Sequence, residues 1–195
     1  MEEIPIKRGN HKIGMDTLIF NITSSHECPS RPLDLCQIPD KCYGMKGERY
    51  NKNSLPYKAR QTAYWDNTDA KKIAYDISAQ INRKFKVKLK FLRLNETGDF
   101  RHQDDVDKAF ALCRELNIIE PDFMVYCFTA RSDLNWAGRP ANFVVNGSGF
   151  MLDNSFTVVE KGYRVSGAEK MCGGNCRKCS LCKYAEGQDI KVEVH

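Results

Sequence analysis

The chain has 195 residues, with 30 Lys and Arg against 25 Asp and Glu, so its formal net charge is +5. Hydrophobic residues make up 42% and charged residues 28%, a balance that excludes a disordered chain and allows a buried core without cross-links. No stretch reaches the roughly 18 apolar residues of a membrane span, and Met1 to Pro5 do not resemble a secretory signal. We therefore expect a cytoplasmic protein with no membrane partner.

The first half of the chain predicts a strand, a long loop and two helices. The strand is expected at residues 17–22 and is followed by a loop at 23–50, rich in Pro and Gly and therefore irregular. Helices are expected at 54–65 and 69–85, and in the second of them apolar side chains recur every four residues.

The second half alternates a strand, a helix and further strands. A strand is expected at 87–94, a helix begins near Asp104, and a largely apolar strand covers 123–130. Two short strands are expected at 143–145 and 156–159. Alternation of strands with helices predicts an α/β fold, built either as a partial (β/α) barrel or as an open, mostly parallel sheet.

The domain organisation follows from where the cysteines lie. Residues 1–165 are expected to form the α/β domain, including the cysteine-rich loop at 23–50. Residues 166–195 are expected to form a cysteine-rich tail packed on it. Nine cysteines, an odd number, in a cytoplasmic protein indicate metal or redox chemistry rather than disulfides.

Four cysteines fall within eleven residues near the end of the chain: Cys172, Cys176, Cys179 and Cys182. Their spacing is the reverse of the bacterial ferredoxin spacing, and four thiolates so placed can surround one inorganic centre. Gly173 and Gly174 allow the backbone to approach it closely. Such tight spacing favours an iron–sulfur cluster, while structural zinc held by the same four thiolates is the alternative.

Three further cysteines lie in the first loop: Cys28, Cys36 and Cys42. Three thiolates can hold three irons of a [4Fe–4S] cluster and leave the fourth iron open to a substrate or cofactor. His26 is a candidate fourth ligand, with a plain surface position as the alternative. The alternative is that these thiols join the tail cysteines in one cluster. Cys113 and Cys127 lie on apolar stretches and are expected in the core.

Polar residues follow two of the predicted strands. Glu96 and Asp99 flank Gly98 and are candidates for binding a ligand amine or for acting as a base, with local backbone capping by Asp99 as the alternative. Asn146 and Ser148 lie in a Gly-rich segment that either cradles an anion or forms a plain turn.

Basic residues are concentrated in two segments: at 71–93, where eight Lys and Arg oppose one acidic residue, and at 41–60, where six oppose one. Tyrosines interleave with the basic residues of the 41–60 segment, a pattern found in proteins that bind nucleic acid through phosphate contacts and base stacking. The alternative is a solvated surface that keeps the protein soluble.

Four motifs in order resemble the phage-encoded "gene product eighty-eight" family. They are the three-cysteine loop ending in Cys42-Tyr43-Gly44, Thr97-Gly98-Asp99-Phe100, Tyr126-Cys127-Phe128-Thr129 and the closing four-cysteine run. The resemblance extends over residues 11 to 185. It departs at Thr97, where Ser is expected, and at Lys183, where an aromatic residue is expected.

The layout also resembles a shortened radical S-adenosylmethionine enzyme. The resemblance implies a [4Fe–4S] cluster on the first loop, S-adenosylmethionine as a cofactor, Gly98 and Asp99 near its amino group, and an auxiliary cluster in the tail. The cysteine spacing in the first loop is wider than in those enzymes.

The sequence therefore predicts an iron–sulfur protein with one or two clusters and a small-molecule ligand or electron donor as partner. If it is an enzyme, its chemistry depends on the cluster. Two alternatives remain: a zinc-stabilised nucleic-acid-binding phage protein and a single-cluster redox protein. Either would act in the cytoplasm of a bacterial host.

Overall fold

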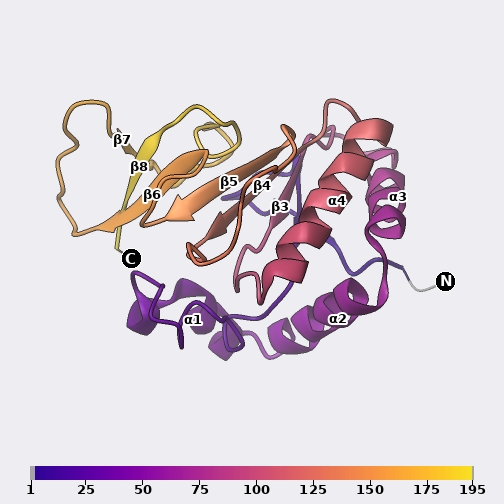
Figure 1. Ribbon diagram of the computed structural model, residues 1–195, viewed down its shortest axis with the longest axis horizontal. Helices are drawn as coiled ribbons and strands as arrows, with labels where there is room; N and C mark the ends of the chain where they lie inside the picture. The colour runs from indigo at the N-terminus through magenta and orange to yellow at the C-terminus, as the bar shows by residue number, and fades with distance from the viewer. Residues whose placement is uncertain (1–2, 195) are drawn as a thin grey trace.

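A single eight-stranded sheet organises the computed structural model, which describes residues 3–194 (Figure 1). The strands are β1 (Lys7–Arg8), β2 (Thr17–Phe20), β3 (Phe91–Leu94), β4 (Met124–Thr129), β5 (Phe143–Ser148), β6 (Asn154–Val159), β7 (Lys170–Met171) and β8 (Asp189–Glu193). They lie in the order β1-β2-β3-β4-β5-β6-β8-β7, and every pair is parallel except β1 with β2. The predicted α/β class with an open, mostly parallel sheet is confirmed.

The helices include two that the sequence did not predict. They are η1 (Pro39–Lys41), α1 (Tyr43–Tyr50), α2 (Ser54–Asn67), α3 (Ala70–Ile81) and α4 (Gln103–Ile119). The loop expected at 23–50 thus contains both η1 and α1. The prediction that helix 69–85 reaches Phe85 was wrong: α3 ends at Ile81, and the Phe85 ring instead lies 4.1 Å from the guanidinium carbon of Arg8.

One face of the sheet packs against α2, α3 and α4 (Figure 1). Alternate residues of the central strands, such as Leu92 and Val125, pack here with Trp65 of α2, Ile77 of α3 and Leu112 of α4. Cys113 and Cys127 are fully buried in this core, which confirms the prediction that both are core residues. None of the described helices is long and apolar enough to cross a bilayer.

The other face of the sheet, here called the tail face, is covered by the C-terminal segment. Phe91, Tyr126 and Val144 form its apolar centre. The ring of Tyr184 packs against that of Phe91 with centroids 6.1 Å apart. After this crossing the chain returns to the sheet as β8, which pairs with β6, so the predicted tail contributes a strand to the same sheet.

Candidate metal centres

The three-cysteine loop lies at the carboxyl ends of β2 and β3, the edge where sites are built in parallel sheets. Gly98, in the loop after β3, has a φ of +76°, and a Cβ built there would lie 2.4 Å from the carbonyl oxygen of Thr23. The Thr23 hydroxyl donates to the Asp99 carbonyl oxygen at 2.9 Å. Glycine at position 98 therefore lets the loops after the first two parallel strands approach each other closely.

Asp99 joins three segments at this edge. Its carboxylate accepts hydrogen bonds from the Thr129 and Ser30 hydroxyls at 2.6 and 2.7 Å, and from the backbone N–H groups of Ala130 and Phe100 at 2.8 and 2.9 Å. Burial raises the pKa of the carboxyl, and these hydrogen bonds act in the opposite direction. Both oxygens are engaged, so the geometry gives Asp99 an anchoring role; its predicted part in catalysis or cofactor binding stays a prediction.

The loop thiols are free and half-buried. Burial raises the pKa of Cys28 to about 11, with Asp99 and the neighbouring thiols Cys36 and Cys42 adding to the rise. Burial also raises the pKa of Cys36. Hydrogen bonds from the Ser30 and Ile38 backbones act to lower these two pKa values, as amides directed at a metal-bound sulfur would.

The other polar candidates are engaged in separate contacts. Glu96 pairs with Lys7 at 2.9 Å. His26 is exposed, and its Nε2 lies 3.8 Å from Glu48. Asn146 and Ser148, predicted to cradle an anion, each have a protein partner: Asn146 donates to the Cys182 carbonyl at 3.0 Å, and the Ser148 hydroxyl accepts from Gln37 at 2.8 Å.

The four tail cysteines are held against the tail face by backbone contacts. Asn154 donates to the Tyr184 carbonyl at 2.9 Å, close to the Asn146 contact with Cys182. The N–H of Cys176 donates to the Lys12 carbonyl at 3.0 Å, and that of Cys172 to the Lys191 carbonyl at 2.7 Å. The segment is thus tied to the beginning, middle and end of the chain.

Two cations lie beside these thiols. Arg93 points from β3 to the tail face, where its guanidinium carbon is 4.9 Å from the Phe128 ring centroid; its Nε is buried without a hydrogen-bond partner among the described residues. Lys183 is 5% exposed, with its Nζ 4.2 Å from the Phe91 ring centroid and 3.6 Å from Asp16. Both side chains supply positive charge near Cys176.

These cations oppose the effect of burial on the tail thiols. Burial raises the pKa of Cys176, while Arg93 and Lys183 act to lower it. Burial and the three other tail thiols raise the pKa of Cys182 to about 12. Without a metal both groups are therefore protonated at neutral pH, which does not suit a reactive nucleophile.

Arg93 and Lys183 were missed by reasoning from the sequence alone. Arg93 is a charged residue between Leu92 and Leu94 in an otherwise apolar strand, and that pattern was the available signal. Lys183 was noticed only as a departure from an expected aromatic residue. The sequence could not show that Arg93 and Lys183 act on the same thiol, because this depends on the tail segment lying over the sheet face to which Arg93 points.

Free thiols are chemically suited to iron or zinc, but the described structure does not group them around a common point. Within residues 3–194, no three His, Cys, Asp or Glu side chains are grouped as a bound metal would require. The seven thiols of the loop and tail are nevertheless free, and each group has an electrostatic environment of its own. Metal binding would require the thiols of a group to come together at a common point.

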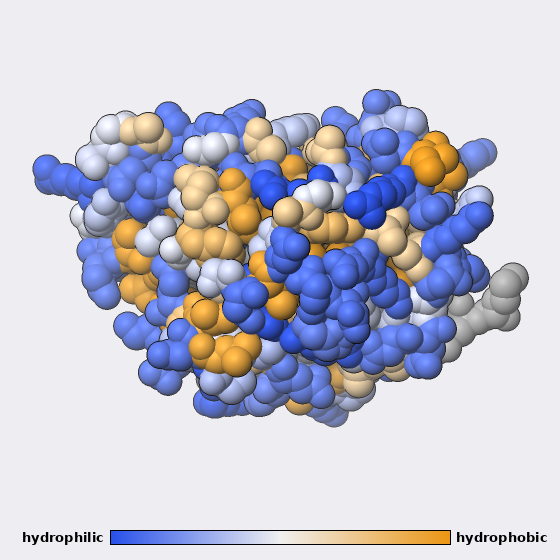
Figure 2. Space-filling view, viewed as in Figure 1, coloured by the Kyte–Doolittle hydropathy of each residue, from blue (hydrophilic) through white to orange (hydrophobic). Residues whose placement is uncertain are grey.

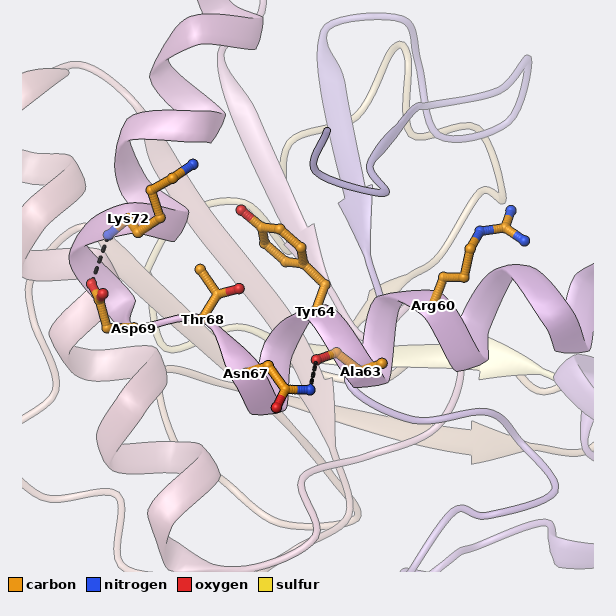
Figure 3. Close-up of a pocket in the computed structure, with 7 residues that line it drawn as sticks. All are labelled: Arg60, Ala63, Tyr64, Asn67, Thr68, Asp69 and Lys72. Carbon is orange, nitrogen blue, oxygen red and sulfur yellow. Dashed lines mark hydrogen bonds between the residues drawn. The ribbon is translucent and has the colours of Figure 1, made fainter. Parts of the chain in front are cut away.

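Two surface hollows lie outside the thiol groups or at their margin. A hollow of about 530 Å³ is bordered by His26, Cys28 and Arg31. Another, of about 450 Å³, lies between α2 and α3 and is lined by Tyr64, Asp69 and Lys72 (Figure 3). The Lys72 ammonium and the Tyr64 hydroxyl both bind Asp76, which the figure does not draw. On the face seen in Figure 2, apolar side chains form small groups divided by hydrophilic ones.

Comparison with known proteins identifies the family. The family model described as Gene product 88 matches residues 4–167, which is most of the chain but ends before the tail cysteines. No curated protein and no solved structure matches the chain. The expected family is therefore confirmed over the α/β domain, and the chain belongs to the Gene product 88 family of phage proteins.

Proposed function

We propose that the protein is an iron–sulfur protein with two centres, one held by Cys172, Cys176, Cys179 and Cys182 and one by Cys28, Cys36 and Cys42. Clusters of this kind transfer electrons, and an iron without a protein ligand also binds small molecules. The reducing cytoplasm of a bacterial host would keep these thiols available for metal rather than for disulfides.

The observation that carries the proposal is the pair of cations, Arg93 and Lys183, beside the tail thiols. Four thiolates around a [4Fe–4S]²⁺ core carry a net charge of about −2, which is costly to bury unless it is compensated. These two cations would offset part of that charge, since the carboxylates of Asp16 and Glu96 also lie near them. Structural zinc with four thiolates has the same net charge, so the test must identify the metal.

Two centres are favoured over one because the thiols interact within their own groups. The pKa of Cys28 responds to Cys36 and Cys42, and that of Cys182 responds to the other three tail thiols. The surroundings also differ: the loop group lies near the buried carboxyl of Asp99, and the tail group lies near cations. The loop centre would leave one iron without a protein ligand.

The hollow beside Cys28 gives a small ligand access to that iron. S-adenosylmethionine is the candidate that the layout resemblance implies. In such a site His26 and Arg31 would border the ligand, while Asp99, already occupied by four hydrogen bonds, would hold the loop in place.

The test is anaerobic purification followed by metal and sulfide analysis. The wild-type protein is expected to be brown and to bind about eight irons per chain, or about four per cluster. Cys179→Ser and Cys42→Ser are each expected to lose about four irons. Cys127→Ala is the matched control, because it removes a buried core thiol that is not a proposed ligand. This variant should keep the full iron content.

Colourless protein containing stoichiometric zinc would contradict the iron–sulfur proposal and establish the zinc alternative. About four irons in the wild type, lost in both Cys→Ser variants, would instead indicate one cluster shared by the two groups. A change in the EPR signal of the reduced protein on adding S-adenosylmethionine would support an open iron, and an unchanged signal would count against it.

A further inference from the structure

Helix α1 has two different faces. Gly44 and Glu48 are buried, whereas Tyr43, Lys46 and Tyr50 are exposed and follow one another at helical spacing. Lys46 and Tyr50 thus lie on the outward side of the helix, whereas the Tyr43 hydroxyl lies near Glu96. Tyr50 is 79% exposed, so its ring is accessible to a ligand from solvent.

In the segment from position 41 to 60, the acidic residue is buried and most basic residues are exposed. Glu48, its one acidic residue between positions 41 and 60, is 3% exposed and pairs with the buried ammonium of Lys58. This pair neutralises itself inside the protein. The exposed charges of the segment are therefore all positive: Lys41, Lys46, Arg49, Lys52 and Arg60.

We propose that this surface binds a single-stranded nucleic acid. The α1 patch, defined as Lys46, Arg49, Tyr50 and Lys52, has three exposed cations within four positions of one exposed tyrosine in the sequence. Cations contact successive phosphates, and an exposed tyrosine provides a face on which an unpaired base stacks. The inference does not depend on the metal centres, because none of the four residues is a proposed ligand.

Charge and ring together favour this partner over other anionic ones. An acidic protein surface would use the cations but gain little from an isolated exposed ring. A membrane surface would require aliphatic side chains beside the cations, and the outward face of α1 carries none. Duplex DNA offers phosphates, but its bases are already stacked.

The test is fluorescence anisotropy of full-length protein with a labelled single-stranded oligonucleotide of about 20 nucleotides, titrated between about 50 and 200 mM NaCl. The K46A/R49A/K52A variant is expected to bind at least about tenfold more weakly and to lower the salt slope by about two. Tyr50→Ala is expected to lose about tenfold in affinity, and Tyr50→Phe, which keeps the ring, to bind like wild type.

The matched control is K71A/K84A/K86A, which removes three exposed charges near α3, at the other end of the molecule (Figure 1). It should change affinity by less than about twofold. An equal loss in this variant, or no effect of Tyr50→Ala, would show a nonspecific polyanion interaction and overturn the proposal. Binding of anionic lipid vesicles but not of the oligonucleotide, or no binding to either, would also overturn it.

Discussion

Arg93 lies between two buried leucines of β3, and strand alternation turns its side chain away from the helices and onto the tail face. There it meets aromatic rings, the thiol of Cys176 and the negative charge of Glu96. Burial acts to lower the pKa of Arg93 and Glu96 acts to raise it, although the two form no ion pair among the described residues. A cation in this position raises the free energy of the protein unless negative charge is near it. Thiolates around a metal in the tail would add to that negative charge.

Replacing Arg93 with Met should therefore weaken the tail centre without affecting the loop centre. We expect the iron content to fall from about eight to about four per chain, while Arg93→Lys, which keeps the charge, retains the iron. Metal analysis of anaerobically purified protein measures this. Full iron content in Arg93→Met would contradict a charge-compensating role.

The four hydrogen bonds to the Asp99 carboxylate predict a loss of stability when this residue is replaced. Replacing it with Asn swaps one acceptor oxygen for an NH₂ group that faces two donors. We expect the free energy of unfolding to fall by about 2–4 kcal/mol, measured by urea denaturation. Asp104→Asn, at a side chain that is 95% exposed, is the matched control and should change stability by less than about 0.5 kcal/mol.

At the scale of elements, the buried pair of Glu48 and Lys58 joins α1 to α2. Glu48 also accepts a hydrogen bond from the Ser25 backbone N–H at 2.8 Å, so one carboxylate fixes α1 against both α2 and the cysteine loop. Burial acts to raise the pKa of Glu48, but Lys58 and Ser25 lower it on balance below 4.5. Stability from this pair is therefore present above pH 4.5 and is lost as the pH falls through the lower pKa of the folded state.

Glu48→Gln should cost about 3 kcal/mol of unfolding free energy near neutral pH, because it leaves the Lys58 charge buried without its partner. The difference from wild type should narrow progressively below pH 4.5, as Glu48 itself becomes protonated. Urea denaturation across this pH range measures both effects. Glu160→Gln, at an exposed position, should be neutral, and a pH-independent difference for Glu48→Gln would contradict the assignment.

At the scale of the whole molecule, the tail segment connects distant parts of the chain. It contacts Lys12 and Asp16 near the beginning, Asn146 in the middle of the sheet, and Lys191 in β8. The contacts of the tail segment with the tail face therefore contribute to the stability of the whole fold. A metal held by the four tail thiols would strengthen these contacts, since a ligand that binds only the folded form stabilises it.

Removing the metal should consequently expose the tail to protease. Arg177 and Lys178 are exposed trypsin sites within the four-cysteine run. We expect chelation under anaerobic conditions to increase trypsin cleavage at these two residues, while cleavage at Lys84 after α3 stays unchanged. Mass spectrometry of the fragments measures both. Equal tail cleavage with and without chelator would argue that metal does not hold this segment.

Helices with a regular apolar stripe were predictable, and elements fixed by long-range contacts were not. Periodicity identified α3 and α4, and apolar runs identified β4 and β5. Helix α1 was missed because its stability comes from burying Gly44 and the Glu48–Lys58 pair, not from an apolar stripe. The short strands β1, β7 and β8 were missed because a partner strand defines them.

The sequence by itself determined the α/β class, the family, the core cysteines and the two groups of remaining thiols, because hydrophobic period and cysteine spacing are local properties. Only the tertiary structure decided that Arg93 and Lys183 meet the tail thiols, that Asp99 anchors three segments, and that Glu48 is withdrawn from the basic surface of α1. Each of these depends on residues far apart in the chain, which are brought together by the order and direction of the strands.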